Sequence, residues 1–114
     1  MSKLVFAVGL SAYGAFEKVR DSHDAELVHE EYHDLGDGRG IGTLVFEKYY
    51  FRTSNRAALV VIVDSLRGET EVRAVATGSS EGLFFNIDWG AGSNFVRSVA
   101  DILEDDITAW REED

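Results

Sequence analysis

A five-residue run, His29 to His33, holds the residue types that could most directly do chemistry. It reads His-Glu-Glu-Tyr-His and so satisfies the H-E-x-x-H pattern of zinc metalloproteases. On a helix, His29 and His33 would lie about 6 Å apart and could share one metal ion. On a β-strand, at ~3.3 Å per residue, the same two residues would be roughly 13 Å apart and could not.

The other ligands of a zinc site are missing around this motif. The longer metzincin pattern places its third ligand ten residues after the first histidine, and that position is Arg39, a cation that would repel the metal. The remaining histidine, His23, precedes the motif, and the chain has no cysteine. We therefore expect no metal and no cofactor, and a zinc hydrolase acting through His29, Glu30 and His33 is the least favoured function.

A glycine-containing segment, Asp88 to Asn94, is a candidate anion site. It precedes a strongly periodic segment, so the sequence predicts a strand-to-helix loop with Ser93 as the helix N-cap. Free backbone N–H groups and the helix dipole at such a place favour an anion, although an ordinary turn explains the same residues. The candidate ligand-binding residues here are Asp88, Trp89, Gly90, Gly92 and Ser93.

A second candidate anion site lies in a mildly basic part of this acidic chain. On a strand, Lys48, Tyr50 and Arg52 would share one face, with Arg56 just past the following turn. Tyrosine hydroxyls and arginine guanidinium groups could hold a carboxylate or phosphate. The alternative is that Lys48 and Arg52 form ion pairs with acids of a neighbouring strand or subunit.

Composition limits the classes of function. The chain has 114 residues, of which 45% are hydrophobic, so we expect one globular domain spanning residues 1–114 with an acidic tail at about 111–114. The net charge of −10 argues against nucleic acid and anionic membranes as partners. The apolar residues near the N-terminus fit a strand and a helix better than a signal peptide, so we expect a cytoplasmic protein.

Strand and helix signals run along most of the chain. The expected strands are residues 3–9, 25–35, 42–52, 56–66, 70–80 and 82–89. The expected helices follow Ser11 as far as about Asp21, and Ser93 as far as Trp110. The segment 25–35 is ambiguous, because Ala25, Val28, Tyr32 and Leu35 would also form one stripe of a helix.

The order β-α-β-β-β-β-β-α with short connections predicts an antiparallel β-meander. Two amphipathic helices on one face of that sheet would give an α+β two-layer sandwich. The strand 58–63 is apolar at both odd and even positions, so we expect both faces of the sheet to be buried there. The face without helices is therefore expected to meet a second subunit, as a homodimer, or to enclose a pocket.

Residues 25–103 resemble a family of small bacterial proteins known only as a domain of unknown function. The resemblance is carried by VFEKYYFRTSNRAALVVIVD, by VRAVATGSSEGLFFNIDWGAGSNFV and by the periodic segment that follows. It implies a small α+β fold around an antiparallel sheet and favours a strand for 25–35. It implies no reaction, substrate or catalytic residue.

Two functional hypotheses remain beside the zinc hydrolase. The first is a non-enzymatic, self-associating binding or regulatory module, because no convincing catalytic set is present: all three histidines fall between positions 23 and 33. The second is a small-ligand binder with an apolar pocket between sheet and helices and an anion-binding edge.

Overall fold

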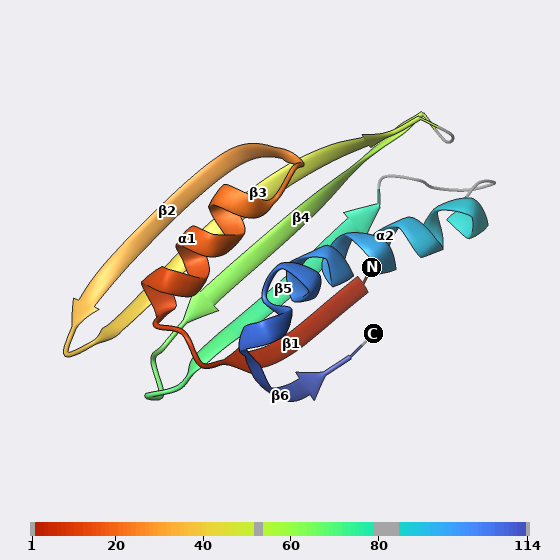
Figure 1. Cartoon of the computed structure of the whole chain (residues 1–114). Coiled ribbons are helices and arrows are strands. Elements are labelled where there is room, and N and C mark those ends of the chain that lie inside the picture. The colour runs from red at the N-terminus through yellow and green to blue at the C-terminus, as the bar shows by residue number, and fades with distance from the viewer. Residues whose placement is uncertain (1, 52–53, 79–84, 114) are drawn as a thin grey trace.

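The chain forms a six-stranded antiparallel sheet with both helices on the same face (Figure 1). The computed structural model describes residues 2–51, 54–78 and 85–113, and describes only the backbone at 50, 55, 78 and 85–91. Its strands are β1 (Ser2–Val8), β2 (Glu26–Gly36), β3 (Arg39–Tyr50), β4 (Asn55–Asp64), β5 (Thr70–Gly78) and β6 (Ile107–Glu112). The helices are α1 (Ala12–Ser22) and α2 (Phe85–Ile102), with a 3-10 turn, η2 (Glu104–Asp106).

The strands lie in the order β2-β3-β4-β5-β1-β6, so β2 and β6 are the two edges. α1 covers β3 and β4, and α2 covers β5 and β1 (Figure 1). This is the expected α+β two-layer sandwich. Among the described residues, no helix combines the length and the apolar character needed to cross a membrane.

Helix α1 begins and ends as its sequence predicts. The Ser11 Oγ accepts a hydrogen bond from the backbone N–H of Gly14 at 3.0 Å, which is an N-cap interaction. The buried stripe faces the sheet and consists of Ala12, Ala15, Phe16 and Val19. The helix ends where the His23 N–H donates to the Val19 carbonyl.

The ambiguous segment 25–35 is a strand. β2 pairs with β3 through a tight turn in which Gly36, Asp37 and Gly38 all have positive φ. The glycines of this turn accept positive φ and so favour a β-hairpin, which places the preceding segment in a strand and not in a helix. A bulge at Val28 lies near the start of β2, and such bulges bend an edge strand.

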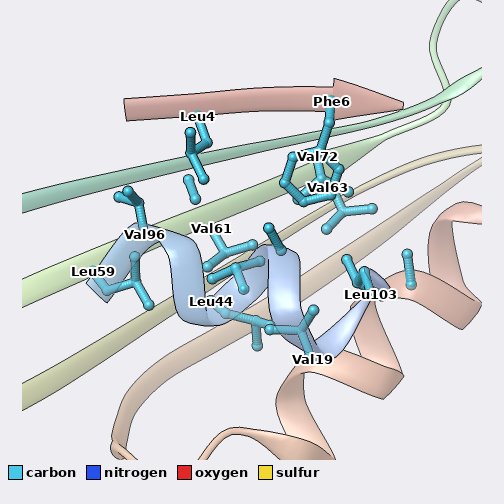
Figure 2. Packing of buried hydrophobic residues seen from close by; sticks show 14 of the residues in the cluster. Leu4, Phe6, Val19, Leu44, Leu59, Val61, Val63, Val72, Val96 and Leu103 are labelled. Carbon is cyan, nitrogen blue, oxygen red and sulfur yellow. The ribbon is translucent and has the colours of Figure 1, made fainter. Parts of the chain in front are cut away.

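The core lies between the sheet and the two helices. Alternate residues of the central strands point into it, including Leu44, Leu59 and Val61. Val96 of α2 and Leu103, which follows α2, belong to the same buried cluster (Figure 2). These five side chains are at most 1% exposed. The described part of the interface between sheet and helices is therefore filled by side chains.

The last two elements are in the opposite order to that expected from the sequence. The segment expected as strand 82–89 is helical from Phe85, while residues 82–84 lie outside the described part of the chain. Ser93 lies inside α2 and is not its N-cap. The observed order is β-α-β-β-β-β-α-β, with the number of strands and helices unchanged.

Packing explains why the glycine-containing segment is helical. A Cβ added at Gly92 would lie 3.1 Å from the Ser2 Oγ, so the helix approaches β1 closely at this glycine. Phe95, Val96 and Val99 continue the buried stripe at helical spacing. Gly92 therefore serves helix-to-strand packing, and the loop expected around it is absent.

The expected C-terminal helix is too long by two turns. The chain leaves the helix after Ile102, and three consecutive acids, Glu104 to Asp106, follow. Negative side chains are unfavourable at the negative end of a helix dipole. Ile107 and Trp110, which fit the helical spacing in sequence, instead lie in β6, where Trp110 packs on Phe6 with ring centroids 5.3 Å apart.

Candidate functional site

The His29–His33 motif lies on the edge strand β2, where it cannot act as a zincin motif. His29, Glu31 and His33 alternate with Glu30 and Tyr32 along the strand, and their register partners are Val45, Thr43 and Ile41. The alternation separates Glu30, the general base of the zincin pattern, from both histidines. Within the described residues, no group of three or more acidic, His or Cys side chains is placed to hold a metal ion.

The two histidines instead bind the glutamate between them. The Nε2 of His29 donates to Glu31 Oε1 at 2.8 Å, and the Nε2 of His33 donates to Glu31 Oε2 at 3.0 Å. These hydrogen bonds lower the pKa of Glu31 below its usual value of 4.5, and the bond from His29 has the larger effect. All three side chains are about half exposed, so this is a surface cluster on a strand edge.

The basic segment does not assemble as one site in its described part. Lys48 pairs with Ala57 on the face that carries Phe46, whereas Arg56 pairs with Tyr49 on the opposite face. Arg56 donates to Glu47 at 3.0 Å and lies over the Tyr49 ring at 5.7 Å. Arg52 lies outside the described residues, as does the side chain of Tyr50.

The candidate anion loop at Asp88 to Asn94 is part of α2. Gly92 and Ser93 are partly buried within that helix, and neither is near its first residue, Phe85. Of Asp88, Trp89 and Gly90 only the helical backbone is described. The free N–H groups of a helix start, on which that site depended, are therefore not supplied by Ser93.

A buried histidine that the sequence did not single out joins α1 to α2. His23 Nδ1 accepts from the N–H of Ala25 at 3.0 Å, so its Nε2 carries the proton and donates to the Ser98 Oγ at 2.8 Å. The Ser98 hydroxyl in turn donates to the carbonyl of Phe95. The imidazole also stacks on Phe46 with ring centroids 4.5 Å apart.

This environment changes the titration of His23. Burial lowers its pKa below the usual 6.5, and the nearby positive charge of Lys48 lowers it further, while Asp24 acts in the opposite direction. Every described polar atom of the imidazole has a partner, and its side chain is 3% exposed. His23 is therefore a structural group that holds the two helices together.

The sheet face opposite the helices, here called the open face, is apolar at its centre. Val45, Val60 and Val75 are cross-strand neighbours on β3, β4 and β5, with Ile62 beside Val60 on β4. All four are partly exposed, and no described element packs on them. An apolar patch left partly in water on a sheet face is a recognised mark of an interaction surface.

Charged side chains surround this apolar centre. One edge of the open face carries His29, Glu31 and His33 on β2. Towards the other edge, Lys3 on β1 forms an ion pair at 3.5 Å with Glu112 of the edge strand β6. Arg73 on β5, opposite Ile62, binds Asp64 at the end of β4 at 2.7 Å and Glu71 at 2.8 Å. An apolar centre with a charged rim is the usual arrangement of a protein interface.

The fold and this face define a small antiparallel α+β sandwich protein that covers one side of its sheet with helices and leaves the other side open. The chain belongs to a family of unknown function, DUF6054, whose model matches residues 15–107. That range includes the 25–103 segment on which the sequence resemblance rests. No curated protein and no solved structure matches the chain.

Proposed function

We propose that this protein is a non-enzymatic, self-associating module that forms a homodimer through its open face. The observation that carries the proposal is the row Val45, Val60 and Val75, three β-branched side chains that remain partly exposed at the centre of the sheet. Transferring such side chains from water into an interface is favourable by ~25 cal/mol per Å² of buried apolar area. A second sheet of the same kind would remove them from water on both copies.

A second copy of the chain suits this face better than a charged partner does. The protein carries a net charge of −10, but the row Val45, Val60 and Val75 across the open face is uncharged. Two copies can therefore meet there while their helices remain on the outside. Two sheets packed face to face about 10 Å apart form the core of a β-sandwich, so this geometry is a common one.

Charges at the rim favour one orientation of the two copies. A twofold axis parallel to the strands and over Val60 would place β2 of one copy over β1 of its partner, so that His29 lies over the partner's Lys3 and Glu31 lies one row of side chains away from it. An axis perpendicular to the strands would instead place β2 over β2 and bring the two Glu31 carboxylates to the same edge, which is repulsive. We therefore propose the first arrangement.

Sedimentation velocity at micromolar concentration tests the proposal. We expect the wild type to sediment as a dimer and Val60→Glu, at the centre of the open face, to sediment as a folded monomer. Leu35→Glu is the matched control, because Leu35 is an exposed apolar residue at the end of β2, away from that centre. A wild-type monomer at this concentration would overturn the proposal.

A charge-reversal pair tests the orientation. Lys3→Glu is expected to weaken the dimer because it places two acids at the rim, and adding Glu31→Lys is expected to restore it. If the loss of dimerisation free energy in the double variant equals the sum of the losses in the two single variants, the two residues do not interact and the orientation is wrong.

The ligand-binding alternative has less support in its original form. It required an apolar space between sheet and helices, and in the described part of that interface Leu59, Val61 and Val99 are fully buried. A cytoplasmic location remains our proposal, supported by the use of Leu4 and Phe6, which are 0% exposed, as core residues of β1.

A further inference from the structure

A polar cavity of about 590 Å³ lies at the end of the sheet where β1 passes into α1. Its walls come from the β1–α1 connection, from Gly38 in the β2–β3 turn, from the β4–β5 turn with Thr70, and from Thr108 of β6. The β1–α1 connection and the β4–β5 turn meet at the same end of the molecule (Figure 1). The cavity is separate from both anion sites expected from the sequence and from the open face.

The start of α1 supplies hydrogen-bond donors to this cavity. The Ser11 side chain and carbonyl satisfy the N–H groups of Gly14 and Ala15. Within the described chain, the N–H groups of Ala12 and Tyr13 have no partner, as expected for the first turn of a helix. Ala12 lines the cavity, and the first turn contains no acidic residue to neutralise the positive end of the helix dipole.

A buried threonine hydroxyl supplies an independent sign of a ligand. Thr70 is 6% exposed and lines the same cavity, and its hydroxyl has no hydrogen-bond partner among the described residues. Its neighbour Ser65 is equally buried but fully satisfied, because its Oγ accepts from the N–H of Gly40 and donates to the carbonyl of Gly38. Buried polar groups are rarely left unpaired, so the hydroxyl of Thr70 takes its partner from the cavity, where the oxygen of a water or of a ligand can accept from it.

The charges around the cavity allow a negative ligand. Glu69 is the one carboxylate in the wall, and it is bound by Arg111 of β6. The unpaired donors of the cavity wall are then the N–H group of Ala12 and the hydroxyl of Thr70, with the N–H group of Tyr13 next along α1. All three can donate a hydrogen bond, so the ligand that fits them presents acceptor oxygens.

We propose that this cavity binds the carboxylate or phosphate group of a small molecule, between the first turn of α1 and Thr70. A volume of about 590 Å³ is within the usual range of small-molecule sites and leaves room for an organic part beside the oxyanion. This site does not depend on the proposed dimer, because none of its walls contributes to the centre of the open face.

Amide chemical shifts of the full chain, followed during titration with inorganic phosphate and separately with acetate, test the proposal. We expect saturable shifts at Ala12, Tyr13 and Thr70 with at least one of the two anions. Sodium chloride at matched ionic strength is the third arm, and it should not reproduce them. Saturation by phosphate alone would identify a phosphate site, and saturation by acetate alone a carboxylate site.

Thr70→Val removes the hydroxyl while keeping the shape of the side chain, and we expect it to weaken binding about tenfold. Thr77→Val, on the same strand but exposed, is the matched control and should bind as the wild type does. Thr70→Ser keeps the hydroxyl and should retain binding, which separates loss of the donor from loss of the fold. Shifts that do not saturate, shifts that chloride reproduces, or unchanged binding by Thr70→Val would each overturn the proposal.

Discussion

The Nε2 of His23 lies 2.8 Å from the Oγ of Ser98, and this contact between residues 75 positions apart joins the end of α1 to α2. Because the imidazole Nδ1 already accepts from Ala25, the bond to Ser98 requires the neutral ring with its proton on Nε2. Protonating Nδ1 would break the bond from Ala25 and place a charge in the protein interior.

His23 should make the stability of the fold depend on pH. Its pKa is lowered in the folded protein, so between that value and the usual 6.5 the unfolded chain binds more protons than the folded one. The free energy of unfolding is therefore expected to fall as the pH drops below about 7, and to level off once the pH is below the folded pKa. Urea unfolding measured between pH 5 and pH 8 checks this.

The control for this pH dependence is a change at the exposed histidines. His23→Gln should lower stability at neutral pH and flatten the dependence, whereas His29→Gln with His33→Gln should leave it in place. An unchanged slope in His23→Gln would show that another group is responsible.

The two histidines on β2 should lower the pKa of the Glu31 carboxyl group. Hydrogen bonds from His29 and His33 lower the pKa of Glu31, so their contribution to stability is present above the usual 4.5 and is lost as the pH falls through the folded pKa. In the variant His29→Gln with His33→Gln, we expect the pKa of Glu31, followed by NMR of its side-chain carboxyl carbon, to rise towards 4.5. A pKa that does not move would contradict the hydrogen bonds described above.

A glycine on β3 should be intolerant of any side chain. A Cβ at Gly42 would lie 2.5 Å from Cδ1 of Phe16 and 2.8 Å from Cδ1 of Tyr32, so two packed rings would have to move. We expect Gly42→Ala to cost roughly 1–3 kcal/mol, as overpacked cores do. Gly9→Ala is the comparison, since its nearest contact would be an ordinary 3.7 Å, and thermal unfolding of the two variants should separate them.

The ion pair between Arg73 and Asp64 should contribute more to the stability of the fold than the exposed pair between Arg111 and Glu69. The Asp64 side chain is 9% exposed, and Arg73→Met would leave its carboxylate buried with only the N–H of Leu66 as a described donor. We expect a loss of roughly 2 kcal/mol, which is less than for a fully buried pair because Arg73 is 30% exposed. Arg111→Met, which breaks the exposed pair with Glu69, should cost under about 1 kcal/mol. Equal losses in urea unfolding would show that burial does not distinguish the two pairs.

The central strands were predictable because their signals are local. The β-branched and aromatic runs at 42–52 and 56–66 and the cap at Ser11 depend on residues close in sequence, and the structure confirms the two strands and the cap. The last helix and strand were not predictable in the same way. Gly92 is helical because β1, some 90 positions away, lies against it, and Ile107 is in a strand because β1 offers it a free edge.

The candidate sites show the same difference. In the sequence, Arg39 at the third-ligand position already argued against zinc at His29 and His33, and the strand at Glu26–Gly36 removes the helical face that the motif needs. The partners of His23 and Thr70, by contrast, come from distant segments, so no spacing of residue types in the sequence marks either one. A lone histidine or threonine carries no pattern until the fold shows what surrounds it.

The position of β1 in the sheet has a consequence for folding. β1 pairs with β5 on one side and with β6 on the other, so this strand, which precedes the rest of the sheet in sequence, has both of its neighbours more than 60 residues further along. The meander β2 to β5 can pair as it emerges from the ribosome, but β1 must wait, with Leu4 and Phe6 exposed, until almost all of the chain is available. Pairing between such distant segments is slow, and this half of the sheet is therefore expected to close last and to be the part most dependent on chaperones.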